Sequence, residues 1–490
     1  MQFSTLPDLR AAQAPHAPCV ADAATSLSNG EFHSRVLVAA GLFDELGIGR
    51  GDVVAVMLPN QVEFVVAMFA AWRLGAAVTP INPSLTAQET IHQITDSGAT
   101  LLINGSGARV LERVQTLPVA ALHGEVQFGA RHAMPAVVDS AALALLIYTS
   151  GTTGLPKGVM LDHANLDAMA RMSRDAMQIT AGDHCLLVLP LFHVNGIVAS
   201  ILTPLSAGSR VTIRARFDID TFFADVERLR PTYFSAVPTI YALLDALPEH
   251  VKPDTSSLRY GICGAAPAAA ELLSHFEARY GFPVVEGYGL SEGTCASTIN
   301  PLHGVRKAGT VGLPFPGQRV AVADAAGRLL PAGATGQVLV QGPNVMRGYL
   351  GKPDETAQTI VDGWLRTGDL GRIDGDGYLS IVGRLKEMII RGGENIYPKE
   401  IEDALAAFPA VLEAAVIGAP HPTLGEIVIA YVACRAGQHG TVDALNDHCA
   451  TRLTRYKRPA AIHVVGSLPK NAVGKIDKLK LRAMWRQEHE

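Results

Sequence analysis

The sequence predicts an α/β fold: a large N-terminal domain of two α/β subdomains and a small β subdomain, followed by a smaller α+β C-terminal domain. Apolar runs of strand length alternate with segments whose apolar residues recur at helical spacing. The pattern changes near residue 309, where Val, Gly and Pro become frequent, and again near residue 383. With 490 residues, 48% of them hydrophobic, the chain can bury the cores of several domains.

The charge of the chain excludes some classes of protein. Only 18% of the residues are charged, and the net charge is −5. A low charge with a high apolar content excludes a disordered chain. A dedicated nucleic-acid binder would be basic overall or carry a basic face, so the composition favours an enzyme.

The first α/β region is expected to span about 140 residues. Residues 53–58 form an apolar run typical of a buried strand, residues 63–74 have helical spacing, and residues 75–78 begin another strand. Strands and helices that alternate in this way favour a parallel sheet covered on both faces. Residues 124–138 are less regular and predict a surface connection.

A second α/β region is expected from the apolar strand at residues 143–148 to about residue 300. Residues 184–209 contain no Asp, Glu, Lys or Arg and are long enough to span a membrane. Pro190 and the polar side chains of His193 and Asn195 argue against a membrane helix. We expect a buried strand, a turn at Pro190 and a helix from about Val194.

The rest of the chain is expected to form two smaller units. Residues 309–345 predict the small β subdomain. The last 105 residues or so combine a helix at 398–408, strands at 414–418 and 427–434, and a basic tail.

The cysteines and the chain ends predict a cytoplasmic protein. No secretory, lipidation or peroxisomal signal is recognised, and no transmembrane segment is expected. No pair of cysteines has C-x-x-C spacing, so buried free thiols in a reducing compartment are expected. They are Cys19, Cys185, Cys263, Cys295, Cys434 and Cys449.

The segment at residues 148–158, YTSGTTGLPKG, is the strongest local signal. It combines hydroxyls, glycines and Lys157 directly after a predicted strand. Backbone N–H groups freed by glycine can surround phosphate oxygens, and Lys157 can add positive charge. The spacing does not fit a Walker A loop. A mobile surface turn is the alternative for such a loop taken alone.

Six further motifs follow in one order: GAAP at 264–267, YGLSE at 288–292, TGD at 367–369, GRLK at 383–386, GGEN at 392–395 and GK at 474–475. Over residues 20–482 the chain therefore resembles the adenylate-forming (AMP-binding) superfamily. It includes acyl-CoA synthetases such as fatty-acid and 4-coumarate CoA ligases, peptide-synthetase adenylation domains and beetle luciferases. The resemblance implies an ATP-dependent carboxylate–CoA ligase. The acid attacks the α-phosphate of ATP to give an acyl-adenylate and pyrophosphate, and CoA then displaces AMP.

The resemblance also implies a nucleotide site with Mg²⁺. Glu292 would be the carboxylate associated with the metal, with a hydroxyl of Thr149 or Ser150, and Lys475 would act in the adenylation step. Asp369 would bind the ribose with help from Arg384, and Tyr288 would stack on adenine. The other residues expected to contact ATP or AMP are Thr149, Ser150, Gly151, Thr152, Thr153, Gly154, Lys157, Gly264, Ala265, Ala266, Glu286, Gly287, Gly289 and Ser291.

In the related enzymes the C-terminal domain rotates between the two half-reactions. The resemblance places the hinge at Lys386, which divides the chain into domains 1–385 and 386–490. Gly392 and Gly393 would then flank the CoA channel, because residues without a Cβ allow close approach. Lys470, Lys478 and Lys480 are expected to be surface charges.

The acyl pocket is the least specified part. By resemblance it is lined by His193, Asn195, Gly196, Val237, Gly287 and Gly289, with His193 as a gate that moves when CoA enters. An ordinary core histidine is the alternative for His193. Residues 193–196 and 235–239 contain no Lys or Arg, so a neutral aliphatic or aromatic monocarboxylate is expected. A small polar acid such as oxalate or malonate stays open.

Three other questions stay open. An adenylation enzyme that loads a carrier protein is one alternative. A non-catalytic nucleotide-binding protein is another, disfavoured because Glu292, Asp369 and Lys475 are all present. The assembly, with a homodimer as one possibility, is not fixed by the sequence.

Overall fold

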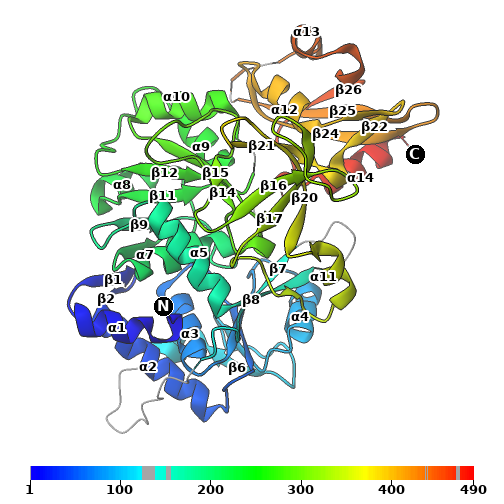
Figure 1. Cartoon of the computed structure of the whole chain (residues 1–490). Coiled ribbons are helices and arrows are strands. Elements are labelled where there is room, and N and C mark those ends of the chain that lie inside the picture. Colours follow the sequence, from blue (N-terminus) through cyan, green and yellow to red (C-terminus); the bar gives the residue numbers. More distant parts are fainter. Residues whose placement is uncertain are drawn as a thin grey trace.

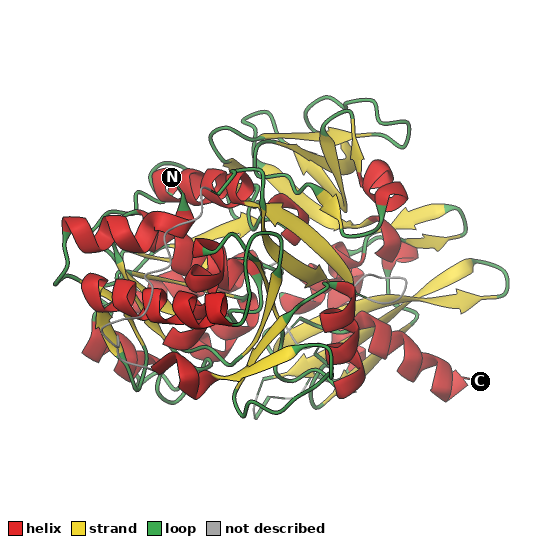
Figure 2. Ribbon diagram, turned by 90° about the horizontal axis from the view of Figure 1, so that it is seen from below, coloured by secondary structure: helices red, strands yellow, loops and turns green. Residues whose placement is uncertain are grey.

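The computed structural model describes residues 2–123, 138–149, 156–266, 268–435, 437–438, 440–470 and 475–489. The expected α/β architecture is present, with three sheets in the N-terminal part and a separate sheet near the C-terminus (Figure 1). The two ends of the chain lie on opposite sides of the molecule (Figure 2).

A seven-stranded sheet contains most of the first predicted region. Its order is β18-β8-β7-β4-β3-β5-β6, and β7, β4, β3, β5 and β6 are parallel. The strands are β3 (Val53–Met57), β4 (Ala77–Pro80), β5 (Leu101–Asn104), β6 (Gln115–Pro118), β7 (Leu143–Thr149), β8 (Lys157–Asp162) and β18 (Gly348–Tyr349). The strands expected near residues 53, 75 and 143 and the helix near 63 (α3, Val62–Arg73) are confirmed.

A nine-stranded sheet forms the second subdomain, in the order β15-β14-β13-β12-β11-β9-β10-β1-β2. Its strands are β1 (Pro18–Ala21), β2 (Ser26–Ser28), β9 (His184–Leu187), β10 (Arg210–Ile213), β11 (Tyr233–Ala236), β12 (Tyr260–Cys263), β13 (Val284–Tyr288), β14 (Thr298–Ile299) and β15 (Leu313–Pro314). The N-terminal strands β1 and β2 therefore leave the first region and complete this sheet, where β1 pairs with β10.

The helices around these sheets begin with recognisable caps. Thr86 and Glu89 form a capping box at α4 (Ala87–Asp96), and Ser28 and Glu31 form one at α2 (Asn29–Glu45). The remaining helices of this part are α1 (Leu6–Gln13), α5 (His163–Ala176), α8 (Phe222–Leu229), α9 (Pro238–Asp245), α10 (Ala270–Tyr280) and α11 (Pro353–Thr359).

The uncharged segment at 184–209 is buried protein core, as expected. It forms strand β9, passes Pro190, and continues through α6 (Val194–Ile197), a π-helical turn (Val198–Leu202) and α7 (Thr203–Ser206). In the part of the chain that the structure describes, no helix is both long and apolar enough to cross a membrane.

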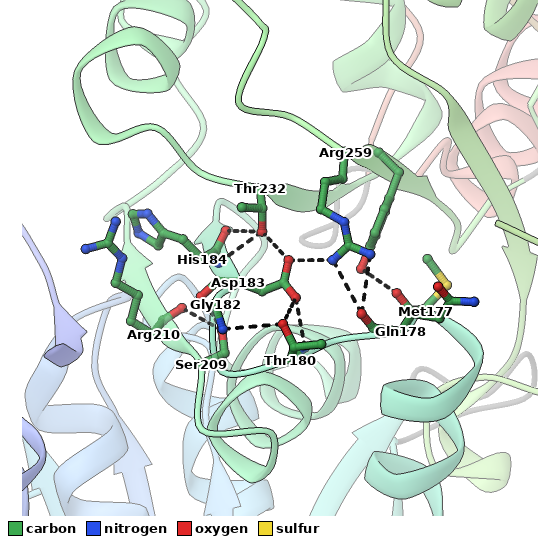
Figure 3. A network of polar contacts seen from close by, with 11 residues as sticks. Met177, Gln178, Thr180, Gly182, Asp183, His184, Ser209, Arg210, Thr232 and Arg259 are labelled. Carbon is green, nitrogen blue, oxygen red and sulfur yellow. Dashed lines mark hydrogen bonds and ion pairs between the residues drawn. The ribbon is translucent and has the colours of Figure 1, made fainter. Parts of the chain in front are cut away.

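A polar network ties together the amino ends of the nine-stranded sheet (Figure 3). The buried Asp183 precedes β9. It accepts hydrogen bonds from the Thr180 amide (2.8 Å), the Thr232 hydroxyl (2.8 Å) and the Arg259 guanidinium (2.5 Å). Thr232 precedes β11 and Arg259 precedes β12, so one carboxylate fixes the starts of three neighbouring strands. The carboxyl ends of these strands are left for the loops beyond them.

Two five-stranded sheets complete the chain. The first contains β16 (Arg319–Ala323), β17 (Thr335–Gln341), β19 (Ile360–Val361), β20 (Trp364–Ile373) and β21 (Leu379–Arg384). The small β subdomain expected at 309–345 thus exists, but it extends to Arg384, and β15 pairs with β14 of the large sheet.

The second contains β22 (Ile389–Arg391), β23 (Glu394–Ile396), β24 (Val411–His421), β25 (Gly425–Cys434) and β26 (Ala461–Val465), and its helices are α12 (Pro398–Ala406), α13 (Val442–Arg452) and α14 (Lys478–His489). Its two hydrophobic clusters draw their buried residues from 389–481 alone, which fits a separate C-terminal domain. The cysteines are free thiols, and four of the six are buried.

Candidate active site

The predicted site residues gather at the carboxyl ends of parallel strands. Strands β9, β11, β12 and β13 are parallel neighbours, and ligands in such sheets bind beyond the carboxyl ends. His193 and Asn195 follow β9, Val237 follows β11, and Gly264 follows β12. Glu286, Gly287 and Tyr288 end β13, and Gly289, Ser291 and Glu292 come directly after it.

Close backbone contacts explain several small residues here. A Cβ on Gly289 would lie 2.0 Å from the carbonyl oxygen of Cys295, and one on Gly196 would lie 2.4 Å from that of Pro190. Ala265 has a φ of +67°, which a residue with a side chain adopts at a cost. Gly264, Ala265 and Ala266 therefore form a tightly shaped turn of small residues, as a surface for a flat ring would require.

Asp369 lies at the centre of the best-defined cluster. It is buried on β20, directly opposite Arg384 of β21. The Arg384 Nε donates to Asp369 Oδ1 at 2.6 Å, and the Tyr288 hydroxyl donates to Oδ2 at 2.6 Å. Burial and the Asp369 carboxylate raise the pKa of Tyr288, so its hydroxyl stays a donor. The structure thus brings together the three residues expected around the nucleoside.

The phosphate side is described in part. Thr149 at the end of β7 pairs with Lys157 at the start of β8. Ser150, Gly151, Thr152, Thr153 and Gly154 lie outside the described residues. The Lys157 ammonium forms an ion pair with Glu355 and lies 5.1 Å from the centre of the Tyr349 ring.

Tyr349 is a site residue that the sequence analysis missed. Its hydroxyl donates to Glu292 Oε1 at 2.8 Å, while its ring faces Lys157. Burial and Glu292 raise the pKa of this tyrosine. The sequence around Tyr349 gives no signal for this role, because its partners Glu292 and Lys157 lie 57 and 192 positions away. Tyr349 links the two charged groups expected near the phosphates.

Lys475 reaches this site from the C-terminal domain. Burial and Arg384 lower its pKa, against the opposing effects of Asp369 and Glu292. Burial lowers the pKa of His193 to about 4, and the positive charge of the Lys475 ammonium contributes to this shift. His193 is therefore a neutral imidazole at pH 7. The Lys475 ammonium thus interacts electrostatically with four residues outside the C-terminal domain: His193, Glu292, Asp369 and Arg384.

Two further predicted site residues, Glu286 and Asn195, form hydrogen bonds in the structure. Glu286 is buried and accepts a hydrogen bond from the Ala268 amide at 3.2 Å, so it holds the turn that follows β12. Burial raises the pKa of Glu286 to about 7. On the acyl side, Asn195 Oδ1 accepts from the Ser235 hydroxyl at 3.1 Å.

The residues expected at the CoA channel lie elsewhere in this structure. Gly392 and Gly393 form the exposed turn between β22 and β23, with φ of +59° and +88°. The Gly392 amide donates to the Leu424 carbonyl, within the C-terminal domain, and a Cβ on Gly393 would meet nothing within 4 Å. Lys386 is exposed in the short turn after β21.

Two lysines expected at the surface form ion pairs with acidic side chains. Lys478 has a 17% exposed side chain and pairs with Glu387 and Glu402, both at 2.8 Å. Lys470 pairs with Glu413 at 2.9 Å. Lys470 is exposed, as expected, whereas Lys478 is partly buried. The sequence does not reveal their acidic partners, which lie 57 to 91 positions away.

Together, the fold and this cluster of residues are those of a nucleotide-dependent enzyme. Comparison with known proteins gives the family. The model of the AMP-binding enzyme family matches residues 8–350, and that of the AMP-binding enzyme C-terminal domain matches residues 400–475. The chain belongs to the AMP-binding enzyme family, in its carboxylate–CoA ligase branch.

Individual relatives agree with this branch. A feruloyl-CoA synthase of Amycolatopsis sp is 37% identical over 97% of both chains, and an oxalate–CoA ligase of Arabidopsis thaliana is 34% identical over 92% of both. The crystal structure of ATP-bound MatB from Rhodopseudomonas palustris has a TM-score of 0.92 at 32% identity over the whole of both chains. The apo structure of the same enzyme gives 0.80 at the same identity and coverage.

Proposed function

We propose that this chain joins a neutral aliphatic or aromatic monocarboxylate to CoA in two steps, through an acyl-adenylate. The observation that carries the proposal is the convergence of His193, Glu292, Asp369, Arg384 and Lys475 on one space between the domains. The first four belong to the large domain, and Lys475 belongs to the small one.

In the first step a carboxylate oxygen of the acid attacks the α-phosphorus of ATP, and pyrophosphate leaves. Asp369 would accept hydrogen bonds from the ribose hydroxyls, while the hydrogen bonds from Tyr288 and Arg384 hold its carboxylate in place. Lys475 would place its cation where negative charge from the acid and the phosphate meets. The TM-score is lower to apo MatB than to ATP-bound MatB. This supports an orientation of the C-terminal domain that serves the adenylation step.

The residues present fit Mg²⁺. Among the described residues no group of three or more His, Cys, Asp or Glu side chains could cage a metal. Magnesium prefers one or two carboxylates together with phosphate oxygens and water, and Glu292, held by Tyr349, offers one carboxylate. We assign Glu292 to the metal, together with a hydroxyl of Thr149 or Ser150. When bound, the ion would neutralise charge on the phosphates.

In the second step the sulfur of CoA attacks the acyl carbonyl carbon, a C–S bond forms, and AMP leaves with the oxygen. We propose that the domain formed by residues 386–490 rotates on the domain formed by 1–385 about Lys386. This motion would bring the exposed Gly392–Gly393 turn to the site as one wall of the CoA channel. The unusual backbone angles of both glycines support a turn that can approach a ligand closely.

The preference for a neutral acid rests on charge. The segments after β9 and β11 carry no Lys or Arg, and His193 is neutral at pH 7. A second carboxylate would therefore find no cation within these segments. Similarity to an oxalate–CoA ligase keeps small polar acids, oxalate or malonate, as the second candidate.

A panel of carboxylic acids tests the proposal. Purified enzyme with ATP, Mg²⁺ and CoA is assayed for AMP and for thioester. We expect neutral monocarboxylates to give both products at equal rates, with oxalate and malonate giving less. Acyl-adenylate without thioester would favour carrier-protein loading instead, and no AMP with any acid would refute the ligase. Cell fractionation and sedimentation would test the proposed cytoplasmic location and a homodimer.

A further inference from the structure

We propose that Glu413 is a positioning residue for the adenylation step. Its carboxylate fastens the segment that carries Lys475 to the acyl side of the large domain. The inference rests on the proposed role of Lys475 in adenylation.

Glu413 lies on β24 of the C-terminal domain, and its side chain is 15% exposed. The Thr239 hydroxyl donates to Glu413 Oε1 at 3.1 Å, and the Lys470 ammonium lies 2.9 Å from the same oxygen. Thr239 belongs to α9 of the large domain, two residues after Val237. One oxygen therefore joins the acyl side of the large domain to the lysine-bearing segment of the small one.

Lys470 is coupled to Lys475 through the backbone. Lys470 and Ile476 form an antiparallel bridge, and the Asp477 amide donates to the Pro469 carbonyl at 2.8 Å. The two ends of the segment are thus pinned to each other. Fixing Lys470 against Glu413 fixes the base from which Lys475 extends, so the contact with Thr239 sets where the ammonium lies relative to the acid.

A second anchor of the same segment provides the contrast. Lys478 pairs with Glu387 and Glu402, but all three residues lie after Arg384, on the C-terminal side. That anchor would travel with the domain in any orientation. The Thr239–Glu413 hydrogen bond instead spans the two domains, and rotation of one domain on the other would break it. Glu413 would therefore serve the first half-reaction and not the second.

The experiment measures the two half-reactions separately for E413A, E413Q and T239V. Adenylation is followed by ATP–pyrophosphate exchange with an acid that the wild-type enzyme accepts. Thioester formation is followed from the chemically synthesised acyl-adenylate of that acid and CoA. E402Q, which removes a charge from the anchor within the small domain, is the matched control, and K475A is the reference.

We expect E413A to lower kcat for adenylation about tenfold, with KM for ATP nearly unchanged. Thioester formation should stay within about twofold of wild type, and T239V should show a smaller loss in adenylation alone. The double variant T239V/E413A should be no worse than E413A, because both remove the same contact. E413Q keeps the size of the side chain and should fall between wild type and E413A.

Several outcomes would overturn the proposed positioning role of Glu413. Equal losses in both half-reactions, no loss in either, or an equal loss in E402Q would each do so. The melting temperature of each variant shows whether a loss comes from unfolding. If K475A removes adenylation and E413A leaves it intact, only the proposed role of Glu413 fails. If K475A leaves adenylation intact, the proposed role of Lys475 fails as well.

Discussion

Tyr288 donates a 2.6 Å hydrogen bond to Asp369, although the two residues are 81 positions apart and belong to different sheets. Tyr288 ends β13 of the nine-stranded sheet, and Asp369 lies in β20 of the small β sheet. The contact therefore fixes the small sheet against the end of the large one, and it orients the carboxylate that we assign to the ribose.

Asp369→Asn should weaken ATP binding. The change removes the charge that Arg384 faces and weakens acceptance from two ribose hydroxyls. Hydrogen bonds to charged groups contribute about 1.5–3 kcal/mol each, so we expect the Kd for ATP to rise at least about tenfold. Isothermal titration calorimetry measures this directly. Asp376→Asn, at an exposed carboxylate paired with Lys307, should bind ATP like wild type.

Lys475→Ala should separate the two half-reactions. In the proposed mechanism the Lys475 ammonium stabilises negative charge that develops during adenylation, so pyrophosphate exchange should fall about 10²–10³-fold. Thioester formation from a supplied acyl-adenylate should remain within a few-fold of wild type. Lys480→Ala is the control for removing a positive charge from the same tail, and it should affect neither. Equal losses in both steps would contradict the assignment.

Tyr349→Phe should weaken the binding of MgATP and spare the fold. The ring that faces Lys157 is kept, while the hydrogen bond to Glu292 is lost. Loss of one hydrogen bond to a carboxylate predicts a rise of about three- to tenfold in the Kd for MgATP, measured by calorimetry at fixed Mg²⁺.

Tyr378→Phe is the matched control for this change. Tyr378 also has a lysine, Lys307, over its ring at 4.5 Å, and its hydroxyl donates to the Val305 carbonyl. It should lose a comparable hydrogen bond without a change in MgATP affinity. Equal effects in the two variants would remove the case for Tyr349 as a site residue.

Asp183→Asn should destabilise the nine-stranded sheet. Breaking the contacts with Arg259, Thr232 and Thr180 should lower the free energy of unfolding by about 2–3 kcal/mol at pH 7. Against the effect of burial, which raises it, hydrogen bonds from Thr180, Arg259 and Thr232 lower the pKa of Asp183 below its ordinary value. This stabilisation is therefore present above the unfolded pKa and is lost as the pH falls through the folded one.

Denaturant unfolding of wild type and variant across pH tests this prediction. The difference between them should be constant from neutral pH to about pH 5 and should shrink below about pH 4. Asp254→Asn, at an exposed ion pair with Arg230, should leave the midpoint nearly unchanged. A difference that grows in acid would contradict the linkage.

Local patterns predicted much of the fold and of the nucleotide site. The absence of charge in residues 184–209 indicated core, and the motifs around Tyr288, Asp369 and Arg384 indicated residues that the structure brings together. These predictions succeed because burial and motif spacing are properties of short segments.

Long-range pairing was not predictable in the same way. Tyr349, Glu413 and the partners of Lys470 and Lys478 act through contacts with residues tens to hundreds of positions away. Nothing in the neighbouring sequence distinguishes such a lysine or glutamate from a solvated surface charge. The pairing of β1 with β10 could not be predicted for the same reason, because the sequence pattern of a strand does not show which other strand it pairs with.

The pairing of β1 with β10 also sets an order of events during synthesis. Val20 pairs with Val211, so the hairpin of β1 and β2 cannot join the rest of its sheet until about 190 further residues have been made. At about 5–20 residues per second, the hairpin stays separate from the rest of its sheet for roughly 10–40 s on the ribosome. The seven-stranded sheet can begin to form meanwhile from β3 to β8. The nine-stranded sheet closes later, and its N-terminal edge is the segment most in need of protection from aggregation as the chain emerges.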